Sequence, residues 1–178
     1  MMIVREAKIA NASAIARVNL DTWRTAYRKI VPIDYLAQLS YEKAESRWQE
    51  ILANVKNTGV FVCVAENESG EIVGFAAGGG ERTGKYIYQG ELFAIYILEE
   101  YQRQGIGRQL VRTVATKLAE LSLNSMLVWV LGDNSAYRFY EFLGGEKVDE
   151  KQTSRAGVAL KEIAYGWKDI AVLINPPV

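Results

Sequence analysis

The N-terminal part of the chain first alternates between apolar and polar residues and then changes to a helical spacing. Residues 3–9 predict a strand, and the apolar residues of 11–27 recur at the spacing of a helix. Pro32 interrupts this pattern, and two further helical segments are predicted at residues 35–39 and 41–52. We therefore expect one strand followed by several helical segments.

The middle of the chain has the pattern of three strands, at residues 59–65, at residues 71–77 and from about residue 86 or 91 to residue 98. The turn-forming residues 67–70 separate the first two strands, which predicts a β-hairpin. A glycine-rich loop at residues 78–84 leads into the third strand.

Helices and strands alternate in the last part of the chain. The expected elements are a helix at residues 110–121, a buried strand at 126–131, a short helix at 135–143 and a strand pair at 146–152 and 160–167. The complete order combines an antiparallel meander with one strand–helix–strand crossover. It predicts a mixed α/β (α+β) fold, formed as a single domain by residues 1–178.

Composition narrows the classes of function. The 178 residues carry 21 basic and 21 acidic side chains, so the formal net charge is zero. This balance argues against a dedicated nucleic-acid binder. No run approaches the ~18–20 apolar residues of a membrane span, and the N-terminus lacks a secretory signal. We expect a cytoplasmic protein without a nucleic-acid or membrane partner, and a homodimer is left open.

The chain contains no histidine, which excludes every mechanism that depends on imidazole. Its single cysteine, Cys63, lies in an apolar run and is interpreted as a core thiol rather than as a nucleophile. We expect no metal site. Chemistry must therefore rely on carboxylates, hydroxyls, amines or the backbone.

Two glycine motifs resemble nucleotide-binding signatures only in part. Residues 79–85 match a phosphate-binding P-loop, but Tyr86 follows where a magnesium-binding hydroxyl is needed. Gly105 and Gly107 begin a dinucleotide fingerprint, but Leu110 replaces its third glycine. A nucleotide-dependent enzyme is the weaker interpretation of both. The turn at residues 102–107 precedes an amphipathic helix, and this position suits a pyrophosphate. A structural glycine turn with solvated arginines is an equal alternative.

Two segments resemble a known family. Residues 91–110, with Gln102, Gly105 and Gly107, closely resemble motif A of the GCN5-related N-acetyltransferases (GNAT), and residues 134–144 resemble motif B. The resemblance implies a central, mostly antiparallel twisted sheet of about seven strands flanked by helices. Strands four and five would splay apart and admit acetyl-CoA, the acetyl donor, without a metal.

The resemblance also implies the residues that contact acetyl-CoA. They are the main chain of Ile95, Tyr96 and Ile97 beside the pantetheine arm, the amides of the pyrophosphate turn with its side chains, and two residues of motif B. The turn comprises Gln102, Arg103, Gln104, Gly105, Ile106, Gly107 and Arg108, and motif B contributes Asn134 and Tyr137. Gly145 departs from the family, which often has an aromatic residue there.

Acetyl transfer to an amine requires loss of a proton, because an alkyl ammonium of pKa ~10.4 is charged at neutral pH. Glu91 opens the strand expected to contact acetyl-CoA and matches the position of the family's general base, but a solvated strand-end carboxylate is an equal alternative. Tyr140 matches the tyrosine thought to protonate the leaving thiolate, with a packed core tyrosine as the alternative. Backbone N–H groups near residues 95–97 would polarise the thioester.

The predicted function is direct acetyl transfer from acetyl-CoA to an amine, of a small molecule or of a peptide, in a ternary complex. The alternative is a catalytically idle acyl-CoA-binding or partner-interaction module. The acceptor pocket is expected around residues 23–39 and 78–90, with Trp23 and Tyr27 as weak wall candidates. Aromatic residues there favour an apolar amine, whereas acidic residues nearby favour a polyamine; the latter are Asp21, Asp34, Glu42 and Glu45.

Overall fold

The computed structural model describes residues 1–176 and contains seven strands. They are β1 (Ile3–Glu6), β2 (Phe61–Glu66), β3 (Ile72–Gly80), β4 (Gly90–Ile97), β5 (Met126–Leu131), β6 (Glu146–Arg155) and β7 (Val158–Trp167). The α-helices are α1 (Ala12–Ala26), α2 (Ile33–Ala37), α3 (Tyr41–Ala53), α4 (Val55–Thr58), α5 (Ile106–Glu120), α6 (Tyr137–Phe142) and α7 (Ala171–Ile174). Within this part of the chain, no helix is both long and apolar enough to cross a membrane.

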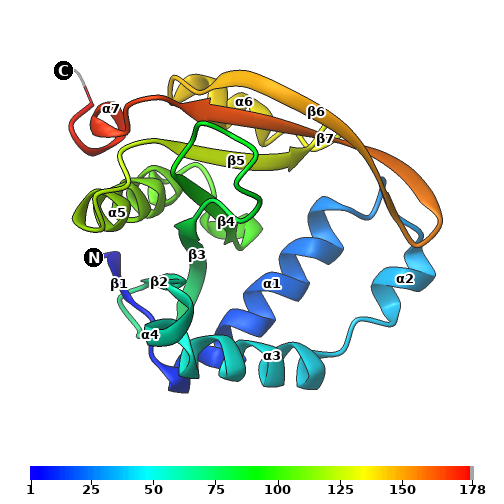
Figure 1. Cartoon of the computed structure of the whole chain (residues 1–178). Helices are drawn as coiled ribbons and strands as arrows, with labels where there is room; N and C mark the ends of the chain where they lie inside the picture. The colour runs from blue at the N-terminus through cyan, green and yellow to red at the C-terminus, as the bar shows by residue number, and fades with distance from the viewer. Residues whose placement is uncertain (177–178) are drawn as a thin grey trace.

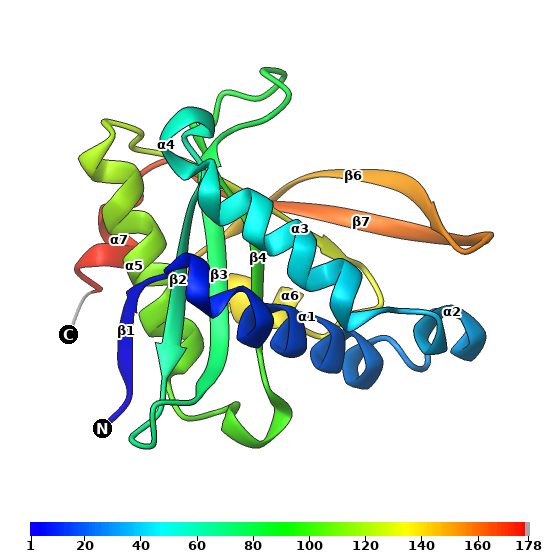
Figure 2. The ribbon, with the colours of Figure 1, turned by 90° about the horizontal axis from the view of Figure 1, so that it is seen from below.

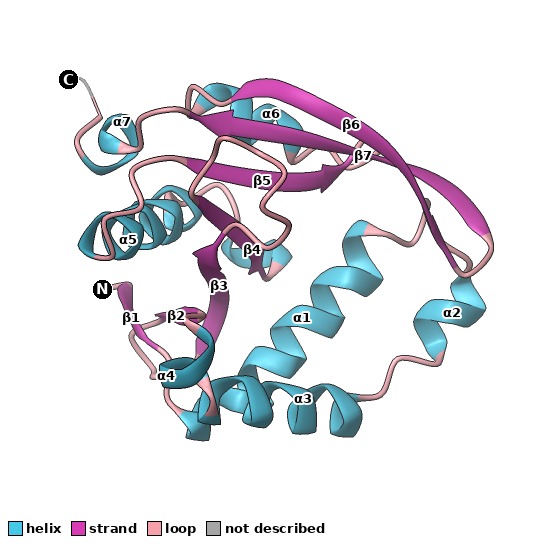
Figure 3. Cartoon of the chain, viewed as in Figure 1, coloured by secondary structure: helices cyan, strands magenta, loops and turns pink. Residues whose placement is uncertain are grey.

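All seven strands form one sheet in the order β1-β2-β3-β4-β5-β7-β6, in which only the β4–β5 pair is parallel. Helices α1 and α3 lie on one side of β3 and β4, and α5 lies on the other (Figures 1 and 3). This arrangement confirms the predicted mixed α/β fold with a mostly antiparallel sheet. Helix α5 makes the crossover between the two parallel strands, as a parallel connection requires.

The centre of the sheet opens after a short parallel contact. Strand β4 pairs with β5 only from Gly90 to Leu92, although β4 continues to Ile97 and β5 to Leu131. On its other side β4 remains paired with β3, and Phe93 is an extra residue in that register. Such a bulge bends a strand locally. The far half of β4 therefore presents an unpaired edge toward β5.

Close packing of α5 explains the glycines of β3 and β4. A Cβ atom on Gly78 would lie 3.0 Å from Val114, and one on Gly90 would lie 2.8 Å from both Leu118 methyl groups. Val114 and Leu118 are completely buried. Gly78 of β3 and Gly90 of β4 thus let the middle and last part of α5 approach the strands.

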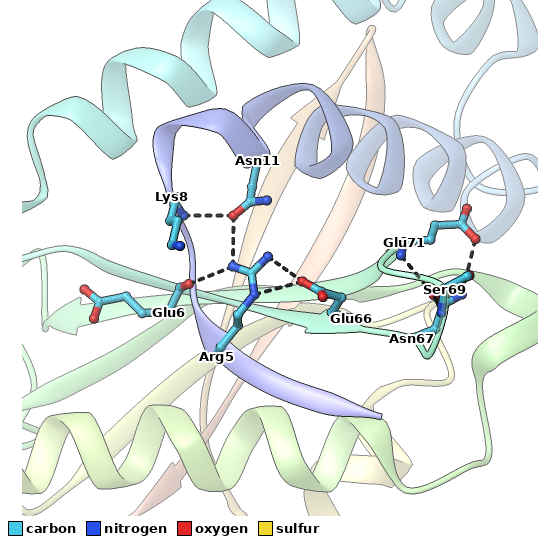
Figure 4. Close-up of polar contacts among 8 residues, drawn as sticks. All are labelled: Arg5, Glu6, Lys8, Asn11, Glu66, Asn67, Ser69 and Glu71. Carbon is cyan, nitrogen blue, oxygen red and sulfur yellow. Dashed lines mark hydrogen bonds and ion pairs between the residues drawn. The ribbon is translucent and has the colours of Figure 1, made fainter. Parts of the chain in front are cut away.

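A polar cluster fastens the edge strand β1 to its neighbours (Figure 4). Arg5 Nε donates to Glu66 of β2 at 2.8 Å, and the same guanidinium donates to Asn11 Oδ1 at 3.1 Å. Asn11 Oδ1 also accepts from the Lys8 amide at 2.9 Å. These contacts tie β1 and the start of α1 to the sheet.

The last two strands are longer than their apolar pattern predicts. Strand β6 continues to Arg155, and β7 already begins at Val158. The two-residue turn Ala156 and Gly157 joins them. Both turn residues have positive φ, 49° and 77°, which is the conformation that matches the twist of a hairpin. The added residues are mostly exposed, so no alternation marked them. Figure 2 shows this hairpin extending past the rest of the sheet.

The sequence left two starts open for the strand that is β4, at about residue 86 or 91, and the start at Tyr86 is wrong. Strand β4 begins at Gly90, and residues 81–89 form a loop. Tyr88 packs in a buried cluster with Leu127, close to Gly166, where a Cβ atom would lie 2.4 Å from the tyrosine ring. Tyr88 thus anchors this loop, and Tyr86 packs against the same cluster, whereas Ile87 is exposed. No helix follows residues 79–85, as expected from the incomplete P-loop motif.

Candidate functional site

A large cleft begins where β4 and β5 separate. Its volume is about 1740 Å³, beyond the ~300–1,000 Å³ of a pocket for one small ligand. Residues of β4, β5, α1, α3, α6 and the turn before α5 line it. The cleft is large enough for two substrates to meet.

The turn before α5 forms a group of free backbone donors. Arg103 and Gly105 have left-handed φ values of 63° and 82°, and Gly105 is the N-cap of α5. Within the described residues, the amides of 103–108 donate to no carbonyl, whereas that of Gln109 donates to Gly105. N–H groups at a helix start, with the positive end of the helix dipole behind them, bind anions. Left-handed backbone at Arg103 is strained and suits a functional turn.

Side chains of this turn have different roles. Arg103 and Arg108 line the cleft, and the Arg108 guanidinium lies 5.3 Å from the centre of the Phe142 ring. Gln102 Nε2 donates to the Ile97 carbonyl at 2.9 Å and fastens the turn to the end of β4.

The remaining predicted side chains of the turn point elsewhere. Gln104 donates to the Glu100 carbonyl at 3.1 Å, and Ile106 is buried in the core. Neither is among the cleft-lining residues of the described chain, so only their main chain is available to a ligand.

The free edge of β4 contributes Ile95, Tyr96 and Ile97 to the cleft wall. The Tyr96 hydroxyl accepts from Trp23 Nε1 at 3.2 Å, and burial raises the pKa of Tyr96 well above its usual value. The Tyr96 side chain is thus held on the α1 side, whereas the Ile97 side chain lies near Gly107 of α5. The β5 side of this stretch has no strand partner among the described residues. An extended ligand could add here as a strand does.

Asn134 joins the cleft to the start of α6. Its Oδ1 accepts from the Ala136 amide at 2.9 Å, and its Nδ2 donates to the Tyr27 hydroxyl at 3.2 Å. Asn134 lines the cleft, whereas Tyr137 is absent from the lining within residues 1–176 and accepts from Arg138 Nε at 3.3 Å. The two predicted motif B positions are therefore not equivalent.

Tyr140 lies at the inner end of the cleft. Its side chain is 4% exposed, and it packs against Phe139, Tyr165 and Trp167. Its hydroxyl makes no hydrogen bond to the described residues, and Tyr140 belongs to the group of residues that lines the cleft. Every fully buried side-chain oxygen among the described residues has a hydrogen-bond partner, so the Tyr140 hydroxyl is not fully buried. The hydroxyl therefore opens onto the cleft. Burial raises the pKa of Tyr140 well above its usual value, which keeps the hydroxyl protonated.

Glu91 is buried and bound to Arg82. Arg82 donates from its amide and Nε to one carboxylate oxygen, at 3.2 Å each, and from NH2 to the other at 2.6 Å. The side chains are 3% exposed for Glu91 and 60% for Arg82. Of the pair, Arg82 lines the cleft, and Glu91 is not among the lining residues of the described chain.

Cys63 lies away from the cleft in the core, as predicted. The thiol is buried, and burial raises its pKa to about 12. A thiol of this kind is a poor nucleophile at neutral pH.

Comparisons with known proteins agree with this geometry. Residues 80–155 match the FR47-like protein family. The chain is 44% identical over 173 residues to the "uncharacterized N-acetyltransferase YuaI" of Bacillus subtilis, covering 97% of this chain and 96% of that protein. The chain belongs to the GCN5-related N-acetyltransferases. It is thus an acetyltransferase whose acetyl donor is acetyl-CoA.

Solved structures of the GNAT fold match the chain along most of its length. The PaiA N-acetyltransferase of Thermoplasma acidophilum, in complex with coenzyme A, has a TM-score of 0.70 at 16% identity and covers 92% of this chain and 98% of its own. The yncA structure from Salmonella typhimurium, with its cofactor acetyl-CoA, has a TM-score of 0.70 at 17% identity, covering 100% and 96%. At these identities the likeness shows the fold.

The donor group fits the residues present. Free amides at residues 103–108 suit a pyrophosphate, and the unpaired edge of β4 suits an extended amide-bearing arm. Within residues 1–176, no group of three or more potential ligands could hold a metal ion.

Several lining residues escaped the sequence reasoning. Trp129 and Arg155 belong to the cleft wall, but neither stands in a GNAT motif. Arg82 also lines the cleft and lies in the 78–90 segment where the acceptor pocket was expected. The aromatic spacing of Trp23 and Tyr27 favours a core stripe, with a pocket wall as the weaker alternative; Tyr27 is buried, and both residues line the cleft.

Trp167 explains why Gly145 departs from the family pattern. A Cβ atom on Gly145 would lie 2.7 Å from the Trp167 ring and 3.0 Å from the Tyr140 carbonyl. The indole Nε1 also donates to the Leu143 carbonyl at 3.0 Å. Trp167 thus fills the space that an aromatic residue at position 145 would need.

Replacing Gly145 by alanine is therefore expected to destabilise the protein by about 1–3 kcal/mol through overpacking. Thermal or urea unfolding measures the change. Gly80→Ala is the matched control, because a Cβ atom there has no neighbour within 4 Å. Equal stability of the two variants would contradict the proposed clash.

Proposed function

We propose that residues 1–178 act as one acetyltransferase domain that transfers the acetyl group directly to an amine in a ternary complex. The main support is the convergence on one cleft of a free-amide turn, an unpaired strand edge and the Tyr140 hydroxyl. Cys63 is remote and its pKa is raised, which speaks against a covalent acetyl-enzyme. Initial-rate patterns of the ping-pong type would contradict direct transfer.

Acetyl-CoA binding is assigned to the turn and to β4. The amides of residues 103–108 would hold the pyrophosphate, with Arg103 and Arg108 adding charge-assisted contacts. The pantetheine arm would lie along Ile95–Ile97. The unpaired N–H groups of bulged β4 would polarise the thioester carbonyl.

Tyr140 is proposed to donate its proton, or a hydrogen bond, to the departing thiolate. Support comes from an unpartnered hydroxyl that opens onto the cleft and stays protonated because burial raises its pKa. Asn134 holds Tyr27 at 3.2 Å and so positions the wall beside Tyr140.

Glu91 is proposed to accept the proton of the amine, directly or through water, after Arg82 has withdrawn. The exposed Arg82 is the partner that can move, since Glu91 is almost completely enclosed. Until then the three hydrogen bonds from Arg82 keep the carboxylate from the substrate. Arg82 would thus act as a positioning residue for the base.

Glu91→Gln is expected to abolish or shift the rise of kcat/KM with pH, because the amide cannot accept a proton. Release of CoA at saturating acetyl-CoA, measured from pH 6 to pH 10, gives the profile. Arg82→Gln should keep that rise, and Glu120→Gln, at the exposed end of α5, is the matched control. An unchanged profile for Glu91→Gln would place the base elsewhere.

Transfer is distinguished from mere binding by two measurements. Calorimetry should detect acetyl-CoA binding, and a panel of amines should release CoA with at least one member. Binding without turnover across a broad panel would favour the idle acyl-CoA-binding module.

A further inference from the structure

The cleft is basic at its acceptor end as well as at its pyrophosphate end. Arg103, Arg108 and Arg138 surround the pyrophosphate turn and α6. The opposite end is lined by a second basic group, drawn from the end of α1, α3, the β3–β4 loop and the β6–β7 turn: Arg28, Lys43, Arg47, Arg82 and Arg155. A chain of zero net charge has thus gathered positive charge along this cleft.

Most of this second group is uncompensated. Among the described residues, Arg28, Lys43, Arg47 and Arg155 have no carboxylate within 4.0 Å. Arg82 is neutralised by Glu91. The acidic residues that suggested a polyamine are not on the cleft wall within residues 1–176.

Three acidic residues, Glu99, Asp133 and Glu162, also line the cleft, against eight basic ones. Glu162 of β7 pairs with Lys151 at 3.4 Å, and its charge acts on the Tyr27 phenol in the sense opposite to that of Arg155, so it offsets the basic group in part. Excess positive charge in a partly enclosed cleft attracts anions and repels multivalent cations.

Arg155 lies beside two aromatic residues of the cleft wall. Its guanidinium lies 5.7 Å from the centre of the Trp23 ring, and its charge acts on the Tyr27 phenol, which Asn134 holds at the cleft. The strained turn at Ala156 and Gly157 sets this position, since Arg155 directly precedes it. A planar guanidinium here can bind a carboxylate or phosphonate with two hydrogen bonds.

The acceptor end is partly closed. Leu160 of the hairpin is buried with Tyr27, Val31 and Leu36 of the α1–α2 segment, and Val158 packs against them. In Figure 1 the hairpin reaches across to α2. The closure favours a small acceptor over a chain that must continue past this point. Aromatic lining residues, Trp23 and Trp129, offer an apolar wall for its body.

We propose that the acceptor is a small amine that also carries an anionic oxyacid group, a carboxylate or a phosphonate, bound by Arg155 together with Arg28. Lys43 and Arg47 add to the attractive field. The inference rests on the proposed acetyl transfer and names its substrate class.

The same charges assist the chemistry. Fixed cations disfavour the ammonium form of a bound amine and thus lower its pKa. An acceptor recognised through its anion would lose its proton more readily, in a protein without histidine whose Glu91 is held by Arg82.

Acceptors that share a body but differ in charge test whether the enzyme prefers an anionic group on the amine. Phenylalanine, its phosphonate analogue, phenylalaninamide and phenethylamine share one apolar body, and spermidine represents polyamines. CoA release is compared per concentration of neutral amine, so that differences in amine pKa do not enter. We expect kcat/KM to be at least tenfold higher for the two anionic acceptors, and the ratio between them distinguishes carboxylate from phosphonate recognition.

Variants then locate the recognition. Arg155→Gln should raise KM for the better anionic acceptor about tenfold, with less than a twofold change for phenylalaninamide, and Arg155→Lys should restore part of the difference. Arg28→Gln is the second recognition variant. Arg112→Gln, exposed on α5 and outside the cleft lining, is the matched control.

The outcomes separate the two proposals. Preferential acetylation of neutral amines or of spermidine, or an unchanged charge preference in both recognition variants, would overturn the acceptor inference and leave acetyl transfer intact. Acetyl-CoA binding without acetylation of any amine would overturn transfer itself, and the inference with it.

Discussion

Replacing Tyr140 by phenylalanine is expected to lower turnover by about 100-fold, since general acid catalysis contributes ~10²–10⁴. The acetyl-CoA dissociation constant should change less than about threefold, because the ring and its packing against Phe139 and Trp167 remain. CoA release gives kcat, and calorimetry gives the dissociation constant.

The control is Tyr165→Phe. Tyr165 is buried 6.3 Å from Tyr140, ring to ring, but its hydroxyl donates to Glu141 at 2.9 Å and is absent from the described cleft lining. Its loss should cost about 1 kcal/mol of stability and leave turnover unchanged. Retention of more than half of kcat in Tyr140→Phe would contradict the assigned role.

The raised pKa of Tyr140 also has a consequence for pH dependence. An ordinary tyrosine loses its proton near pH 10. A phenol whose pKa is raised stays protonated there, so turnover should not fall on the alkaline side up to pH 10. A loss of activity near pH 10 that disappears in Tyr140→Phe would contradict the burial argument.

Gly105→Val is expected to weaken acetyl-CoA binding by about 100-fold or more. A β-branched residue is strained in the left-handed conformation that Gly105 adopts at φ 82°. Relief of this strain would move the free amides of the turn. Losing two charge-assisted hydrogen bonds at ~1.5 kcal/mol each corresponds to that factor. Calorimetry with acetyl-CoA and with CoA measures it.

Gly70→Val separates strain from binding. Gly70 has φ 81° and open space around its Cβ position, but it lies in the β2–β3 turn. Both variants should lose similar stability in unfolding experiments. Equal acetyl-CoA affinity in Gly105→Val and Gly70→Val would show that the turn before α5 does not bind the pyrophosphate.

Local signals predicted most of the element order and the glycine-containing turn before α5. Apolar periodicity located the helices α1, α3 and α5, because each buries one face in the core. Short apolar runs located the strands from β1 to β5, of which β3 and β5 are buried almost throughout. Gly105 and Gly107 marked a turn that needs left-handed backbone and close packing: a Cβ atom on Gly107 would lie 3.1 Å from Phe139. In the outer part of β6 and β7 most residues are exposed, so the apolar pattern did not predict that the strands continue.

The tertiary structure decides which charged side chains lie next to each other. The sequence placed Glu91 at the start of a strand, but only the folded loop brings Arg82 onto it. The basic lining of the cleft likewise combines Arg28, Lys43 and Arg155 from separate parts of the chain.

The sequence alone thus determined the family, the layered fold and the turn before α5, because these depend on periodicity and on backbone conformations that few residues adopt. Only the tertiary structure decided which charges face the cleft and which are neutralised. Electrostatic interaction depends on distance in space, and residues such as Trp23 and Arg155 become neighbours only when the sheet has formed.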